Sequence, residues 1–243
     1  MDCYVVKFLF SGVSQLHDSR QEQVLGQLMA RVKSHIDVCK GYYNLRIPTH
    51  IVDLIKAVNR TFSNTIFCGG TVEELICGKY VDNCNPNNLT IQFADQMYLE
   101  KYKAELLEMT LASFKTYQGQ YHISDITQSK AGMIYENWIR ETIKEVNHER
   151  VVVAVKDRDP VGFVTIKETE YAVEGVLSAV DPAKRKLGAY KAMIAFLINY
   201  AVKKNKSFVT STQFDNFIVQ GVWNTLGLKP FYSIYNIHID GRL

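Results

Sequence analysis

At 243 residues, the chain exceeds the usual size of one domain, so the sequence allows one large domain or two unequal ones. Its 47% hydrophobic, 12% aromatic and 22% charged residues are typical of a globular protein and exclude a disordered or collagen-like chain. The formal net charge of +3 is too small to indicate nucleic-acid binding by itself, because proteins that bind phosphate backbones concentrate cations on one face.

The five cysteines indicate neither a disulfide framework nor a zinc site, because their number is odd and no C-x-x-C pair occurs. We therefore expect no metal and a reducing, cytoplasmic location. Residues 1–16 lack the features of a signal peptide, and the sequence contains no run of 18 apolar residues. No membrane partner is expected.

The first part of the chain alternates strand-like and helix-like segments. "CYVVKFLF" predicts a strand, and Asp18 begins a long helical pattern. "GYYNLRI" predicts a second strand, "PTHIVDLIKAVNR" a helix that begins near Pro48, and "NTIFCGG" a third strand that ends at its paired glycines. This βαβαβ order predicts a small α/β domain over residues 1–85, with a polar, Asn-rich linker at residues 82–90.

The second part, residues 90–243, begins with helical patterns at 94–117 and 129–146. Between them lies "YQGQYHISDI", a loop that could form a pocket wall. "RVVVAV" and "VGFVTIK" predict a hairpin, and "YAVEGVLSAV" predicts a strand that runs into a basic turn. A helix at 187–202, the strand "SFVTSTQF", a helix at 216–226 and the strand "FYSIYNIHI" complete this part.

The basic turn indicates an anion site. From Lys184 to Lys206 the chain carries seven Lys or Arg residues and no Asp or Glu. The start of a helix offers unpaired backbone N–H groups and a partial positive charge, and Gly188 would let a ligand approach the backbone closely. These cations could instead form a solvated helix face. The positions of Pro182, Arg185 and Gly188 after an apolar strand favour the anion site.

The segment "VDPAKRKLG" resembles the V-x-P-x-x-R-x-x-G motif with which the GNAT acetyltransferase superfamily binds acetyl-CoA. The resemblance implies an α/β fold with a mixed, twisted, mostly antiparallel sheet flanked by helices. It also implies acetyl-CoA as cosubstrate, its pyrophosphate held by the turn amides and its pantetheine arm paired with the preceding strand. By position, these contacts fall on Ser178, Val180, Arg185, Lys186, Leu187, Gly188, Ala189 and Tyr190. Tyr190 stands where the family usually has Gly or Ala.

The C-terminal segment "TSTQFDNFIVQGVWNTLGLKPFYSIYNIHI" resembles the TDP-fucosamine (TDP-4-amino-4,6-dideoxygalactose) N-acetyltransferases, as do "ASFKTYQGQYHISDI" and "YENWIRETI". The resemblance implies a nucleotide-linked amino-deoxy sugar as the amine acceptor and coenzyme A contacts from Asn216 and Trp223. Asn216 could instead only cap a helix, and Trp223 could only pack. The implied substrate contacts are Tyr121, His122, Asp125 and Trp138.

Acetyl transfer to an amine needs a neutral nucleophile, donors for the developing oxyanion and a proton for the departing thiolate. Glu174 is similar in position to glutamates that act as bases in the histone-acetylating branch of the superfamily. Trp223 stands where the family has a tyrosine acid, and an indole N–H cannot give up a proton. Tyr232 or Tyr190 could supply that proton instead, or solvent could.

Three other functions are compatible with these residues. The enzyme could use another small-molecule amine or acyl donor, or the chain could be a non-catalytic module that binds coenzyme A or a nucleotide sugar. A nucleic-acid partner would rest on the cations of residues 184–206 alone, and no stacking aromatics interleave with them. We therefore expect no nucleic-acid partner, and a homodimer is compatible with the sequence.

Overall fold

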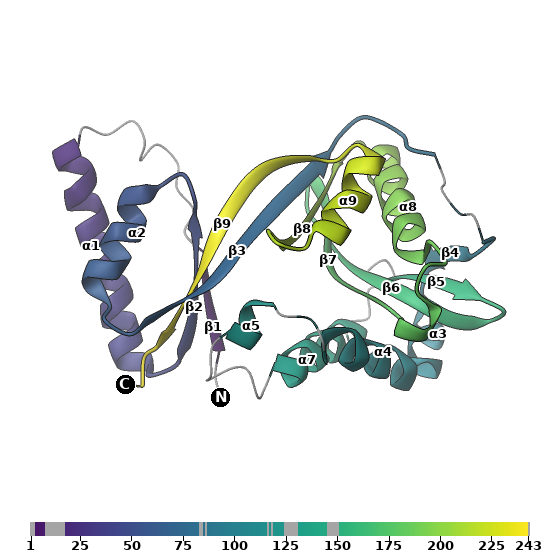
Figure 1. Cartoon of the computed structure of the whole chain (residues 1–243), viewed down its shortest axis with the longest axis horizontal. Helices are drawn as coiled ribbons and strands as arrows, with labels where there is room; N and C mark the ends of the chain where they lie inside the picture. The colour runs from purple at the N-terminus through teal and green to yellow at the C-terminus, as the bar shows by residue number, and fades with distance from the viewer. Residues whose placement is uncertain are drawn as a thin grey trace. The chain divides into compact units, whose positions relative to one another are not determined.

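The structure is a computed structural model (Figure 1), and it folds as two compact units. The first consists of residues 1–72 and 232–243, and the second of residues 73–231. No helix in the described part of the chain combines the length and apolar character that a bilayer-spanning segment requires. The described residues are 3–7, 18–82, 85, 87–115, 117, 119–123, 131–144 and 151–242.

The strands of the first unit follow the order β1-β2-β9-β3. β1 and β2 pair in parallel, which requires a crossover connection, and α1 supplies it. β9 pairs with β2 in the antiparallel sense. The predicted βαβαβ order is confirmed, but the expected domain ranges 1–85 and 90–243 differ from the observed division, because the last strand returns to the first unit. Its elements are β1 (Cys3–Lys7), α1 (Asp18–Cys39), β2 (Tyr42–Pro48), α2 (Val52–Thr61), β3 (Thr65–Ile76) and β9 (Lys229–Asp240).

Alternation along β2 and β9 separates an apolar face from a polar one. Leu45 and Ile237 belong to a buried cluster with side chains of α1 and α2. On the other face, Asn44, Asn236 and His238 are almost fully buried. The Tyr42 hydroxyl hydrogen-bonds Nδ1 of His238, and burial lowers the pKa of His238 to about 4.

The second unit contains the strand order β3-β8-β7-β6-β5-β4. β4 to β7 are antiparallel neighbours, whereas β7 and β8 pair in parallel. The expected mixed, mostly antiparallel sheet is thus confirmed. Its elements are β4 (Thr90–Phe93), α3 (Gln96–Lys101), α4 (Lys103–Lys115), α5 (Gln120–Ile123), α7 (Ala131–Lys144), β5 (Val151–Lys156), β6 (Asp159–Glu168), β7 (Ala172–Val180), the 3-10 turn η2 (Pro182–Lys184), α8 (Ala189–Lys203), β8 (Ser207–Gln213) and α9 (Phe217–Leu226).

Helices cover both faces of this part of the sheet, with α8 and α9 on one side and α4 and α7 on the other (Figure 1). Because β5 is buried on both faces, its sequence is a nearly continuous run of apolar residues. Val152 and Ala154 join the cluster that contains α8, while Val151 and Val153 join the cluster that contains α4 and α7. The sheet therefore holds its helices through two separate cores.

Three elements differ from the sequence-based expectation. The helix expected at 94–117 is two helices: the Asp95 side chain caps the start of α3 by accepting a hydrogen bond from the Tyr98 amide, α3 ends at Lys101, and α4 begins at Lys103. β4 occupies residues at the end of the expected linker. β3 continues to Ile76 instead of ending at its paired glycines, since Gly69 adopts a φ of 85° within the strand.

Candidate functional site

β7 and β8 stop pairing partway along their length. Their parallel register runs from Ala172 opposite Ser207 to Gly175 opposite Thr210. At that last pair the Thr210 hydroxyl donates to the Gly175 carbonyl, at 3.2 Å. β7 then continues to Val180 without a partner in β8. The two strands therefore leave an opening in which backbone N–H and C=O groups of β7 are free to bind an extended ligand.

A β-bulge lies at the start of this opening. Thr165 of β6 is opposite Leu177, but Ile166 is opposite Gly175, so Val176 is the extra residue. The Thr165 hydroxyl accepts a hydrogen bond from the Leu177 amide, at 3.0 Å, and holds the bulged strand in place. The peptide group of Val176 is thus outside both ladders and can serve a ligand.

The turn after β7 presents a row of unused amides. The Asp181 side chain accepts from the Ala183 amide, at 2.9 Å, and shapes the start of the turn. Gly188, with a φ of 77°, then leads into α8, whose first bond runs from the Ala192 amide to the Gly188 carbonyl. In the part of the chain that the structure describes, the backbone amides from Arg185 to Lys191 donate to no acceptor. These amides and the helix N-terminus have the chemistry to bind an anionic group such as a phosphate.

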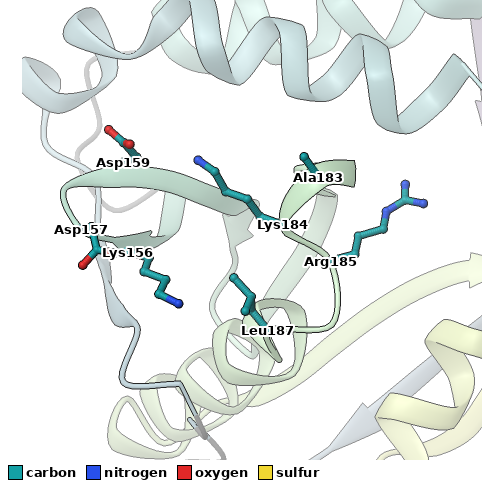
Figure 2. Close-up of a pocket in the computed structure, with 7 residues that line it drawn as sticks. All are labelled: Lys156, Asp157, Asp159, Ala183, Lys184, Arg185 and Leu187. Carbon is teal, nitrogen blue, oxygen red and sulfur yellow. The ribbon is translucent and has the colours of Figure 1, made fainter.

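The cations of the turn divide into two kinds. Lys184 is committed to the protein, because Nζ donates to the Pro160 carbonyl at 3.1 Å and lies 3.7 Å from the Asp181 carboxylate. Figure 2 shows Lys184 extending toward the β5–β6 hairpin and Arg185 extending the opposite way, and both residues line a pocket of about 300 Å³. Arg185 and Lys186 are exposed and form no ion pair within the described residues. They are available to an anionic ligand.

A buried hydroxyl lies next to the opening. Nε1 of Trp223 donates to the Tyr190 hydroxyl oxygen, at 2.9 Å. The Ser178 side chain lies close enough to the same hydroxyl to lower its pKa. Trp223 is only 1% exposed, so its indole packs in the core, as the alternative interpretation predicted. Burial raises the pKa of Tyr190, and the negative charge of Glu74 adds to the increase.

Glu74 is a site residue that the sequence analysis missed. It lies on β3, it is 5% exposed, and burial raises the pKa of its carboxyl group while the nearby charge of Lys229 opposes that increase. A glutamate inside the apolar segment "TVEELI" was the signal that could have identified it.

Asn216, Glu174 and Val180 have defined places around the opening. Asn216 caps α9, with Oδ1 accepting from the Val219 amide at 3.5 Å. Glu174 is partly buried one residue before the last β7–β8 pair. The Val180 carbonyl accepts from the Ser113 hydroxyl, at 3.1 Å, so it is already used by the protein.

Tyr232 does not belong to the same unit as these residues. It belongs to the first unit, where its ring centroid is 6.1 Å from that of His50. Ser178, Tyr190 and Trp223 belong to the second unit. The structure therefore does not bring Tyr232 together with them within one unit.

The residues predicted to bind the acceptor have different surroundings. Tyr121 is buried against Tyr135, with ring centroids 5.7 Å apart. Burial lowers the pKa of His122, which favours the neutral imidazole. Trp138, on α7, is 40% exposed and its ring is accessible. Asp125 lies outside the described residues.

Tyr117 connects this region to β8 and was not predicted. Its hydroxyl hydrogen-bonds the Thr212 side chain and the Gln213 backbone, and burial raises its pKa to about 12. The aromatic residues around it lie in "FKTYQGQY", which spans the end of the helix predicted from the sequence and the start of the following loop. Among the described residues, no group of three or more His, Cys, Asp or Glu side chains is arranged to hold a metal ion.

The comparisons with known proteins agree with this geometry. Residues 111–228 match the model of the acetyltransferase (GNAT) family. The comparison with curated protein sequences gave no match.

Three solved structures share the fold at identities too low to carry function. One is a GCN5-related N-acetyltransferase from Sphaerobacter thermophilus, with a TM-score of 0.60 and 13% identity over 84% of this chain and 62% of that one. A tandem GNAT protein from the clavulanic acid biosynthesis pathway gives a TM-score of 0.59 and 10% identity, over 98% of this chain and 75% of that one. A GCN5-related glucosamine N-acetyltransferase region of a fungal multi-domain protein gives a TM-score of 0.59 and 9% identity, over 82% of this chain and 25% of that one.

The chain thus spans less than two thirds of the Sphaerobacter protein. The family match includes β7, the turn with its free amides, α8 and β8, and it is these elements that form the opening. Residues 111–228 thus match the acetyltransferase (GNAT) family model, and the fold of the solved structures agrees with that match.

Proposed function

We propose that the chain transfers an acetyl group from acetyl-CoA to the amine of a small-molecule acceptor. The observation that carries this proposal is the juxtaposition of free amides from Arg185 to Lys191 with the unpaired end of β7. The amides would bind the pyrophosphate, and the backbone of Ser178 and the N–H of Val180 would pair with the pantetheine arm. Arg185 and Lys186 would form ion pairs with the phosphate groups.

The thioester would then lie near the apex of the opening. Acyl transfer generates negative charge on the carbonyl oxygen, so a preorganised N–H donor is needed there. The Val176 peptide group, outside both strand ladders, is our candidate for that donor. Glu174, partly buried beside the last strand pair, is our candidate for the base that deprotonates the amine.

The acceptor that we propose is a nucleotide-linked 4-amino-4,6-dideoxy sugar of the TDP type. The support is the resemblance of the segments around Tyr121 and Asn216, together with the partly exposed Trp138, on whose ring a base or sugar could stack. A neutral His122 can hydrogen-bond a sugar hydroxyl. From the cysteine pattern we place this activity in the cytoplasm, and a homodimer stays a prediction.

The test is thiol release from acetyl-CoA by the purified chain with a panel of acceptors: a TDP-4-amino-4,6-dideoxyhexose, simple amines and peptides. We expect release with the TDP-amino sugar and none without an acceptor. Release with another amine alone keeps the enzyme class and rejects the sugar. Binding of acetyl-CoA without release across the panel, and across longer acyl-CoAs, would identify a non-catalytic coenzyme A module instead.

A further inference from the structure

The hydroxyl of Tyr190 is held between the two sides of the opening. On one side lies Ser178, on β7 beyond the last pair with β8, close enough to lower the pKa of the hydroxyl. On the other side it accepts from Nε1 of Trp223, on the helix that follows β8. The hydroxyl therefore lies next to the gap between the strands and away from the exposed end of the turn.

The proton of this hydroxyl is available for donation. An indole has an N–H and no acceptor, so the Tyr190 oxygen must be the acceptor in the bond with Trp223. The Ser178 hydroxyl can also donate to that oxygen. Since the indole donates to the oxygen, the phenol keeps its own proton, which it can give to Ser178 in the resting state or to a ligand in the gap. Burial raises the pKa of Tyr190, so the proton is present throughout the physiological range.

The charged surroundings favour a protonated phenol in the resting state. Within the described residues, Glu74 on β3 is the charged group that acts on Tyr190, and Lys229 on β9 acts in turn on Glu74. Ser178 and Trp223, from β7 and α9, carry no charge. The two donors would stabilise a phenolate once the proton has left, because charge-assisted hydrogen bonds are stronger than neutral ones.

We propose that Tyr190 is the proton donor to the sulfur of coenzyme A, and that Trp223 and Ser178 are positioning residues that hold its oxygen. The inference rests on the proposed acetyl transfer. The amine nitrogen attacks the thioester carbonyl carbon, the C–N bond forms, and the C–S bond breaks with its electron pair on sulfur. The Tyr190 proton passes to that sulfur and gives the thiol. The phenolate regains, through solvent, the proton that the acceptor nitrogen loses.

This arrangement explains the two substitutions that depart from the family pattern. Tyr190 replaces a small residue, and Trp223 replaces a tyrosine. Taken alone, each departure weakens the expected site, but together they place a hydroxyl at the opening from α8 and use the indole N–H to orient it. The acid is thus carried by a different helix, while its oxygen stays next to α9.

The experiment compares Tyr190→Phe with the unchanged chain in the thiol-release assay, with acetyl-CoA affinity measured by calorimetry. Removing one hydroxyl keeps the ring packing, so we expect affinity within about twofold and a kcat lower by about 100-fold or more, the scale of general acid catalysis. The deficit should shrink as the pH rises past about 8.5, the ordinary pKa of a thiol, because the thiolate can then leave without a proton.

Tyr200→Phe is the matched control, since Tyr200 lies on the same helix and its hydroxyl bonds the Glu168 carboxylate at 3.1 Å. It should keep full activity. A fully active Tyr190→Phe enzyme, or a loss of kcat that is the same at all pH values, would overturn the inference and leave acetyl transfer standing. An unchanged chain that releases no thiol with any acceptor would contradict both proposals.

Discussion

Both units bury polar side chains beside their strands, but in different settings. In the first unit, Asn44 and His238 face each other across paired strands, and Asn236 donates to the Thr71 hydroxyl at 2.9 Å. In the second unit, the Tyr190 hydroxyl lies near the part of β7 that no longer pairs with β8. The polar groups of the first unit are enclosed between paired strands and can only support the fold, whereas a polar group beside an opening can also contact a ligand.

The largest expected effect lies at the turn. In Gly188→Val, a branched side chain must adopt a φ of 77° and enter the row of free amides. The left-handed conformation alone costs roughly 1–2 kcal/mol, and with the added obstruction we expect acetyl-CoA to bind on the order of 100-fold more weakly. Isothermal calorimetry measures the change, with thermal unfolding as the check on folding.

Gly221→Ala on α9 is the control for this substitution, because a Cβ at Gly221 meets open space. Its affinity should equal that of the unchanged chain. If Gly188→Val bound acetyl-CoA as tightly as this control, the turn would not be the phosphate site.

The polar face of the first unit should govern stability instead of binding. His238 is neutral in the folded chain down to about pH 4, whereas it takes up a proton near pH 6.5 when unfolded. Between these values the unfolded state binds more protons, so stability is fully present above pH 6.5 and falls as the pH drops toward 4. We expect a loss of about 3 kcal/mol, measured by denaturant unfolding across this range.

His238→Gln removes the titrating group and should flatten that part of the pH profile, with acetyl-CoA affinity unchanged at pH 7.5. The same steep profile in the variant would show that another group is responsible. A loss of acetyl-CoA affinity in the variant would contradict the assignment of this face to stability.

The smallest expected effect comes from the exposed cations. Replacing Arg185 and Lys186 together by alanine should weaken acetyl-CoA binding about fivefold at low salt, since each exposed charge contributes at most about 1 kcal/mol. The difference should disappear near 1 M salt because the Debye length falls to about 3 Å. Calorimetry at two ionic strengths tests both statements.

Lys203→Ala provides the comparison, because Lys203 ends the 15-residue helix α8 that begins next to the turn. That helix is about 22 Å long, well beyond the screening distance. An equal loss of affinity in Lys203→Ala would mean that the overall charge, and not the turn, attracts the ligand.

Much of the second unit follows from local patterns in the sequence. The buried strand "RVVVAV" reads as a continuous apolar run, and the fixed positions of Pro182 and Gly188 are enough to locate the turn. Gly188 adopts the positive φ that only glycine accepts without strain, so the motif and the backbone agree. Turn chemistry and periodicity are properties of a few neighbouring residues, which is why they can be predicted.

The contacts that complete the site depend on tertiary structure and could not be predicted. The bond between Tyr190 and Trp223 joins residues 33 positions apart, and each looked like a departure from the family pattern. Glu74 lies in a strand that seemed to end at the preceding glycines, so its place beside Tyr190 was hidden. Tyr117 reaches Thr212 from a loop without periodicity.

Hydrogen exchange of the backbone amides, followed with and without coenzyme A, tests the central claim most directly. If the turn binds the pyrophosphate, exchange should slow at the amides from Arg185 to Lys191 with coenzyme A but not with acetylated pantetheine, which lacks the diphosphate. Unchanged exchange at these residues with saturating coenzyme A, or equal protection by both compounds, would contradict the account.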